Sequence, residues 1–177
     1  MTTIPVKEKG SAFLNCFWDL VSDDPSLRQV AARGILQYLE NPQRTRANEE
    51  AAKDVAYTVK RLVRGLSSSR ESARLGFATC LVEVLRMPQV QPREVMGLID
   101  ESTRVTGSVK RADERDLVFG RLFGLLAVVR SGRIDDDAET CEDIFEQLIH
   151  LLHSKVNFCL FLCMDKILCY YAIYCWD

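Results

Sequence analysis

Four arginines around one short polar turn are the strongest candidates for chemistry in this chain. Arg61 and Arg64 end one amphipathic stretch, and Arg70 and Arg74 follow the run Ser67–Ser69. A guanidinium group forms forked hydrogen bonds to phosphate or carboxylate, so we interpret the four side chains as an interaction surface. Two alternatives stay open: phosphate contacts at the start of the following helix, or ion pairs with acidic residues of the chain itself. No aromatic residue interleaves the arginines, which argues against recognition of nucleic-acid bases by stacking.

A metal site would have to come from histidine and cysteine side chains near the C-terminal end. His150 and His153 are three residues apart, and Cys159 and Cys163 are four apart. Zinc sites usually show tighter cysteine pairs than these. We therefore predict no metal and no cofactor. The histidines suit the negative end of a helix dipole, and the cysteines suit the role of small buried apolar groups.

Motifs for nucleophilic or phosphate chemistry are missing from the sequence. It contains no Gly-x-Ser-x-Gly elbow, no P-loop and no Gly-x-Gly-x-x-Gly run. Ser67–Ser69 have no local base and are interpreted as a turn and helix cap. Gly120 and Gly124 lie in an apolar stretch and are expected to allow close contact between helices. We therefore predict no catalytic residue, no small-molecule substrate and no enzymatic activity.

Hydrophobic residues recur at three- and four-residue steps through most of the chain, which predicts helices and no confident strand. Asp24 before a proline predicts an N-cap, and Gly132 predicts a C-terminal cap. Ser68 with Glu71 predicts a capping box. The seven expected helices cover about 11–22, 24–40, 47–66, 69–87, 91–105, 111–131 and 138–153.

The order of these elements predicts an all-α fold. Helices of this length joined by short polar turns suggest antiparallel pairs stacked in sequence, as in an α-solenoid of the HEAT or armadillo kind. The sequence shows no clean internal repeat at the ~40-residue period of such proteins, so a compact irregular helical bundle is the alternative. The second, fourth and sixth expected helices are apolar around much of their circumference. We expect these three to be sandwiched between neighbours.

Composition divides the chain into three parts. Residues 1–10 are expected to be a flexible N-terminus, 11–153 a helical-repeat domain, and 154–177 an apolar tail rich in Cys and Tyr. The tail has three interpretations: a membrane span, a last helix packed on the others, or a non-native ending from a truncated or mis-spliced transcript. Asp165 and Lys166 argue against a span, because a charge at its middle costs about 2.5–3.5 kcal/mol. We favour the non-native ending.

Charge is distributed unevenly along the chain, although the formal net charge is only -2. Residues 41–133 hold 17 basic and 11 acidic side chains, whereas residues 134–153 hold seven acids and no Lys or Arg. The basic middle is either a solvated helical surface or a face for acidic or nucleic-acid partners. The N-terminus has no apolar signal core. Seven cysteines without such a signal indicate reduced thiols in a cytosolic or nuclear setting.

Three blocks of sequence together resemble one protein family. Residues 61–76 contain Arg-Leu-x-x-Gly-Leu-x-Ser-x-Arg-Glu-x-Ala-Arg. An earlier block has Phe13, then Phe17, Trp18, Asp19 and Leu20, then Arg28, Ala31 and Ala32. A later block has Leu-Phe-Gly-Leu-Leu-Ala within 120–127 and Ser-Gly-Arg at 131–133. In order and spacing these resemble the N-terminal part of the Myb-binding protein 1A / DNA polymerase phi family of nucleolar proteins, over about residues 12 to 153. Fungal members of the family are called DNA polymerase V.

This resemblance implies a function without catalysis. Such a chain would be an N-terminal fragment of a helical scaffold acting in rRNA gene transcription, transcription regulation and ribosome biogenesis. The implied partners are proteins, namely transcription regulators and pre-ribosomal factors, with DNA, chromatin or rRNA as further candidates. The implied location is the nucleus and nucleolus, although no compact basic import cluster occurs in this sequence. The resemblance also favours the solenoid.

The family name raises the alternative of a DNA-directed DNA polymerase. Nucleotidyl transfer needs carboxylates that hold two metal ions about 3.5–4 Å apart. The clustered acids are Asp135–Asp137 and the group Asp113, Glu114 and Asp116. Both clusters lie at expected helix starts, where negative charge is favourable for capping alone. We therefore predict a structural role for them. A membrane-anchored adaptor acting through the tail is the second alternative.

Overall fold

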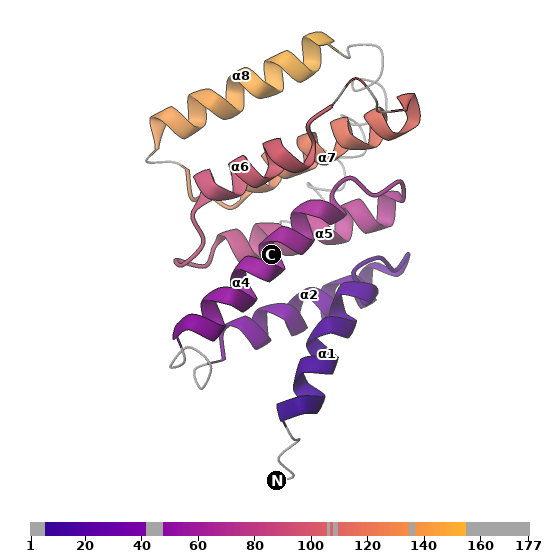
Figure 1. The fold of residues 1–177 in the computed structure, drawn as a ribbon, viewed down its shortest axis with the longest axis vertical. Helices are drawn as coiled ribbons and strands as arrows, with labels where there is room; N and C mark the ends of the chain where they lie inside the picture. The colour runs from indigo at the N-terminus through magenta and orange to yellow at the C-terminus, as the bar shows by residue number, and fades with distance from the viewer. Residues whose placement is uncertain (1–5, 42–47, 106, 108–109, 135–136, 155–177) are drawn as a thin grey trace. The chain divides into compact units, whose positions relative to one another are not determined.

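The computed structural model describes residues 6–41, 48–105, 107, 110–134 and 137–154. These residues form seven helices and no strand, which confirms the predicted all-α class (Figure 1). Each helix overlaps an expected one, because the apolar period and the turn residues fix both. The helices are α1 (Val6–Asp19), α2 (Pro25–Leu39), α4 (Asn48–Gly65), α5 (Glu71–Leu85), α6 (Pro92–Ser102), α7 (Arg111–Arg130) and α8 (Ala138–Ser154).

Contacts divide the chain into two units, Met1–Asp136 and Asp137–Asp177. The first unit holds α1 to α7, and the second holds α8. The predicted domain boundaries after residues 10 and 153 stay predictions. Within the described ranges, no helix has the length and apolar character that a membrane crossing requires. Residues 155–177 lie outside those ranges, so the three interpretations of the tail are untested.

Consecutive helices of the first unit pair into three hairpins, α1 with α2, α4 with α5, and α6 with α7 (Figure 1). The second helices of the hairpins contact one another in order, α2 with α5 and α5 with α7, and α4 contacts α6 in the other layer. Stacked hairpins of this kind are what an α-solenoid requires. The choice between a HEAT or armadillo solenoid and a compact bundle stays a prediction.

α5 is the most enclosed helix of the first unit, because it lies between α2 and α7 and also packs on α4. Ten of its 15 residues are buried, which confirms the prediction that this helix is sandwiched between neighbours. α2 was also expected to be sandwiched, but one of its apolar sides is uncovered, since Leu27 is 40% and Val30 is 62% exposed. The largest fully buried side chains of the unit include Phe17, Leu20, Ile35, Leu62, Leu66, Leu81, Leu85, Ile99 and Leu125.

Two predicted helix ends are confirmed. The Asp24 carboxylate accepts a hydrogen bond from the Ser26 amide at 2.8 Å, and Pro25 is the first residue of α2. Gly132 follows the C-cap of α7 with a φ of 65°, a left-handed conformation that strains residues with a side chain. Both turns therefore begin or end helices where the sequence indicates.

Two arginines hold the connections between helices of the first unit. Arg28 of α2 donates to the carbonyl oxygens of Ser22 and Asp23, at 2.8 and 3.1 Å. Arg133 donates to the carbonyl oxygens of residues 85, 86 and 87, at 3.3, 3.4 and 2.8 Å. These carbonyls end a helix or form a loop, where backbone oxygens lack intrahelical partners. Each guanidinium thus satisfies backbone groups and fixes the path of the chain.

Two glycines of α7 allow close helix packing, as predicted. A Cβ on Gly120 would overlap the Ser67 hydroxyl in the turn before α5. A Cβ on Gly124 would lie 2.9 Å from the Ile99 side chain of α6. Neither position has room for a larger residue without a shift of its neighbour.

α8 begins at a side-chain cap within the second unit. The Asp137 carboxylate accepts hydrogen bonds from the amide, at 3.0 Å, and the hydroxyl of Thr140. This confirms the predicted capping role for Asp137, whereas residues 135 and 136 lie outside the described residues.

Candidate interaction surface

The turn between α4 and α5 has a different geometry from the predicted capping box. α5 begins at Glu71 with Arg70 as its N-cap, and no side chain caps it. The Ser68 hydroxyl oxygen accepts from the Arg70 amide at 3.2 Å, which closes a local turn two residues long. The capping-box prediction is therefore wrong, because Ser68 precedes the N-cap by two residues.

Arg74 lies inside the packed helices. Its side chain is 10% exposed and donates to the Ser68 carbonyl oxygen at 2.6 Å. Its guanidinium also lies 3.9 Å from the Asp116 carboxylate and 4.8 Å from the centre of the Phe119 ring, both on α7. Arg74 thus joins the turn and α5 to α7, and its inclusion in an accessible surface is corrected. Burial of this position appears only once α7 is packed on α5.

Arg70 is exposed, but it has an acidic neighbour from a distant part of the sequence. Its guanidinium lies 3.3 Å from the Asp23 carboxylate in the loop before α2. The pKa of Asp23 is lowered by hydrogen bonds from Ser72 and Arg70 and by the positive charge of Arg70. An exposed pair of this kind contributes little to stability. Arg70 is therefore partly neutralised as an anchor for an external anion.

Arg61 contacts a cluster of aromatic rings that the sequence does not reveal. Its guanidinium donates to the Tyr57 hydroxyl at 2.7 Å and lies 4.3 Å from the centre of the Phe17 ring. The Trp18 and Tyr57 rings follow at 6.0 and 5.9 Å. No aromatic residue interleaves the arginines in the sequence, but the fold brings the Phe17 and Trp18 rings of α1 beside Arg61. The four-residue spacing of Tyr57 and Arg61 could have indicated the contact between those two residues, but two rings come from α1.

Arg64 is exposed and shares the outer face of α4 with other cations. Lys53, Tyr57, Lys60, Arg61 and Arg64 fall within an arc of about 100° on an ideal helix. We call these five residues, together with Trp18 of α1, the basic–aromatic face. Within the described part of the chain, no acidic partner is found for its four cations. The first turn of α4 carries Glu49 and Glu50, so positive charge is concentrated toward its C-terminal end.

The structure therefore divides the four predicted arginines. Arg61 and Arg64 belong to the basic–aromatic face, Arg70 pairs with Asp23, and Arg74 is buried. The sequence placed the four in one turn, but the direction of each side chain depends on which helix covers it.

The clustered acidic residues that were weighed as metal ligands, and predicted to be structural, form no metal site in the described part of the chain. Asp113 and Glu114 lie in the first turn of α7, and Asp116 faces Arg74. No group of three or more His, Cys, Asp or Glu suited to a metal ion occurs among the described residues. His150 and His153 lie on α8, and the cysteines considered with them lie outside those residues.

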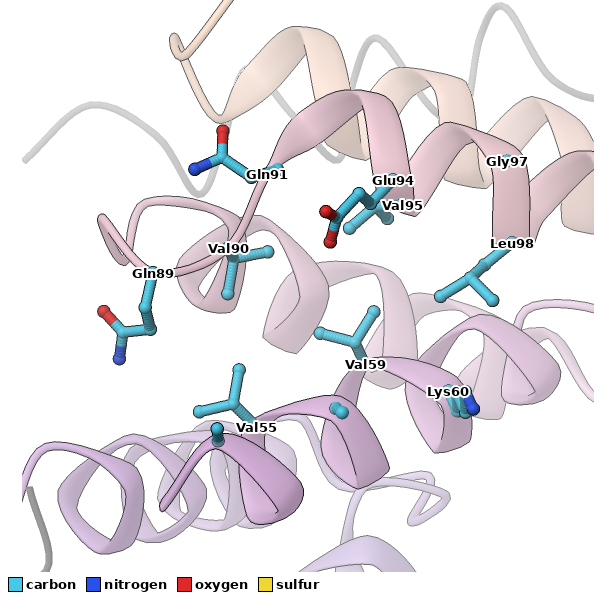
Figure 2. A pocket seen from close by; sticks show the side chains of 12 residues that line it. Val55, Val59, Lys60, Gln89, Val90, Gln91, Glu94, Val95, Gly97 and Leu98 are labelled. Atoms are coloured by element: carbon cyan, nitrogen blue, oxygen red, sulfur yellow. The ribbon is translucent and has the colours of Figure 1, made fainter. Parts of the chain in front are cut away.

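A groove of about 510 Å³ lies between α4, α6 and the loop that precedes α6 (Figure 2). Val55 and Val59 of α4 face Val90 and Leu98 across it, as Figure 2 shows. The polar lining residues are Lys60, Gln89, Gln91 and Glu94. The groove has apolar walls and one charge of each sign, so its own chemistry favours no particular partner. Lys60 belongs to both the groove and the basic–aromatic face.

Comparison with known proteins assigns the chain to a family. The family model described as DNA polymerase phi matches residues 57–165. The rDNA transcriptional regulator pol5 of Schizosaccharomyces pombe is 36% identical over 165 residues, which cover 91% of this chain and 15% of the relative. Myb-binding protein 1A of Mus musculus is 34% identical over 151 residues, or 85% of this chain and 11% of the relative.

The rDNA transcriptional regulator POL5 of Saccharomyces cerevisiae is 35% identical over 139 residues, which cover 68% of this chain and 13% of the relative. No solved structure matches the chain. The chain thus spans only a small part of the length of the curated relatives that it matches. These matches show that the chain belongs to the Myb-binding protein 1A / DNA polymerase phi family.

Proposed function

We propose that this chain is a non-catalytic helical scaffold segment that acts in the regulation of rRNA gene transcription. The observation that supports this most strongly is the match to relatives named rDNA transcriptional regulators, one of which covers 91% of the chain. The matched region includes the stacked hairpins of the first unit, whose buried residues are chiefly apolar. Stacked helices of this kind offer an extended surface for partners instead of one reaction pocket.

The proposed partners are proteins, with transcription regulators and pre-ribosomal factors as the expected classes. DNA or rRNA are the further candidates. The name Myb-binding protein 1A supports a protein partner for that relative. The proposed location is the nucleus and the nucleolus, since transcription of rRNA genes takes place there. Ribosome biogenesis belongs to the same proposal.

The structural basis of this function would be distributed contact. The first unit presents exposed cations on α4 and an apolar groove beside them, so charged and apolar contacts lie on neighbouring parts of one surface. Rigid packing beneath that surface, around α5, would hold the contact residues in fixed positions. Preorganisation of this kind reduces the entropy lost when a partner binds.

A chimeric protein tests the proposed function. The segment of Schizosaccharomyces pombe pol5 that matches this chain would be replaced by residues 1–154, and synthesis of pre-rRNA would be measured by pulse labelling. We expect the chimera to sustain more synthesis than pol5 lacking the segment, at equal protein level. Equal synthesis by the chimera and the deletion would overturn the proposal.

The polymerase alternative has its own test. Purified chain would be incubated with primed template, deoxynucleotides and Mg²⁺, and extension of the primer would be measured. We expect no extension, because Asp113 and Glu114 lie in the first turn of α7 and Asp116 faces Arg74. Extension that co-purifies with the chain and is lost in the Asp113→Asn variant would establish an enzyme instead.

A further inference from the structure

The basic–aromatic face combines exposed aromatic rings with exposed cations. Trp18 is 70% exposed and Tyr57 is 45% exposed, although both carry large apolar rings. The cation of Arg61 lies about 6 Å from each ring centre. Large exposed aromatic side chains that lie together on one surface are typical of a site that a partner covers.

The charge of the face restricts the chemistry of that partner. Lys53, Lys60 and Arg64 are exposed, and together with Arg61 they extend over 11 residue steps of α4, about 16 Å along its axis. An acidic partner would therefore gain attraction along the whole stripe. The rings add a requirement that a carboxylate alone does not meet, namely a flat group that can stack on them.

From this juxtaposition we infer that the basic–aromatic face binds single-stranded nucleic acid. Bases of a single strand stack on exposed aromatic rings, while cations beside the rings contact the phosphates. Bases of a duplex are already stacked on one another and cannot reach Trp18 or Tyr57 without unpairing. The inference rests on the proposed function, because it names the partner class that this scaffold surface would hold. Leu14 of α1 is also exposed and would suit an apolar peptide side chain, so a peptide serves as the competing outcome.

Arg61 has a supporting position in this arrangement. The Phe17 ring below its guanidinium is 1% exposed, and the Tyr57 hydroxyl accepts one of its N–H groups. The guanidinium is therefore held in one place, where it orients the Tyr57 ring and adds positive charge. Arg64 lies one turn further along α4, where its exposed side chain is free to contact a phosphate.

Fluorescence anisotropy of the purified full chain tests the inference. The probes are labelled single-stranded RNA, single-stranded DNA and duplex DNA of equal length, together with a polyglutamate peptide. We expect both single strands to bind more tightly than the duplex or the peptide. Trp18→Ala should weaken single-strand binding about 5- to 150-fold, the range expected for loss of a stacked base. Trp18→Phe keeps an aromatic face and should restore most of it.

Charge variants separate this face from a general electrostatic effect. Arg64→Glu should make the slope of log K against log salt less negative by about 0.7 or more. This is the change expected when one phosphate contact on a single strand is lost. Arg33→Glu makes the same charge change at an exposed residue of α2 and should leave the slope closer to that of the parent. Arg70→Glu should have a smaller effect than Arg64→Glu, because Asp23 already pairs with Arg70.

Four results would overturn the inference: tighter binding of duplex, tighter binding of polyglutamate, equal effects of the Arg33 and Arg64 variants, or no effect of Trp18→Ala. Circular dichroism melting of each variant distinguishes lost binding from lost folding. The chimera experiment is independent of these results. A chimera that sustains pre-rRNA synthesis while the chain binds no single strand would retain the scaffold function and refute only the nucleic-acid ligand.

Discussion

The close approach of α5 to the corner between α1 and α2 makes Gly76 the most sensitive small residue of the fold. A Cβ at this position would overlap the carbonyl oxygen of Leu20 and would lie 3.0 Å from the Arg28 side chain. The nearest atom belongs to the backbone, so no side-chain rotation can relieve the contact. The change Gly76→Ala therefore forces α5 away from the corner.

The size of the effect follows from two opposing contributions. Alanine is favoured over glycine in a helix by about 1 kcal/mol. Overpacking of a well-packed core costs about 1–3 kcal/mol and rises when backbone must move. Separation of α5 from the corner would also disturb Leu20, which is fully buried, and Arg28, which holds the loop carbonyls. We expect Gly76→Ala to lower the free energy of unfolding by up to about 2 kcal/mol net, which is the overpacking cost less the gain in helix propensity.

Gly97 of α6 provides the matched control. It is also a helical glycine, but a Cβ there would meet no atom within 4 Å. Gly97→Ala should therefore raise the free energy of unfolding by about 0.5–1 kcal/mol through helix propensity alone. Urea unfolding followed by circular dichroism would measure both variants against the parent. A Gly76→Ala protein as stable as Gly97→Ala would refute the packing argument.

Three further predictions concern named side chains. Arg133→Ala should lower the free energy of unfolding by about 1.5–3 kcal/mol, because the carbonyl oxygens of residues 85–87 lose their charged donor; urea unfolding measures it, and an unchanged midpoint would contradict it. The lowered pKa of Asp23 adds stability above its ordinary value of 3.8, and this stability is lost as the pH falls through the lower folded value. Asp23→Asn should remove that acid-dependent loss of melting temperature, whereas an identical pH profile would exclude a role for the Ser72 and Arg70 contacts. Burial raises the pKa of the Cys80 thiol, so little reactive thiolate is present at neutral pH. Iodoacetamide should therefore label this residue only after unfolding, as read by mass spectrometry. Rapid labelling of the native chain would show that α5 is less enclosed than described.

The positions of the helices were largely predictable from the sequence. Apolar spacing gave the expected ranges, and Asp24, Pro25 and Gly132 marked helix ends that the structure confirms. These signals are local, because each depends on residues within one or two turns. The Ser68–Glu71 pattern predicted a capping box that the structure does not contain, because a short sequence motif permits more than one turn geometry.

The interaction surface was only partly predictable. The sequence singled out Arg61, Arg64, Arg70 and Arg74, but their exposure and partners differ in ways that spacing does not encode. Pairing of Arg70 with Asp23 joins residues 47 positions apart, and burial of Arg74 depends on α7. Likewise, the groove between α4 and α6 exists only because two hairpins are stacked.

The sequence by itself determined the all-α class, the order of the helices and the family. These follow from the period of apolar residues, from local capping chemistry and from sequence similarity to the relatives. The tertiary structure alone decided that Arg61 lies over a ring of α1, that Trp18 remains exposed, and that Arg74 is enclosed. The physical reason is that side-chain burial and charge pairing are set by neighbours distant in sequence, which become neighbours only when the hairpins pack.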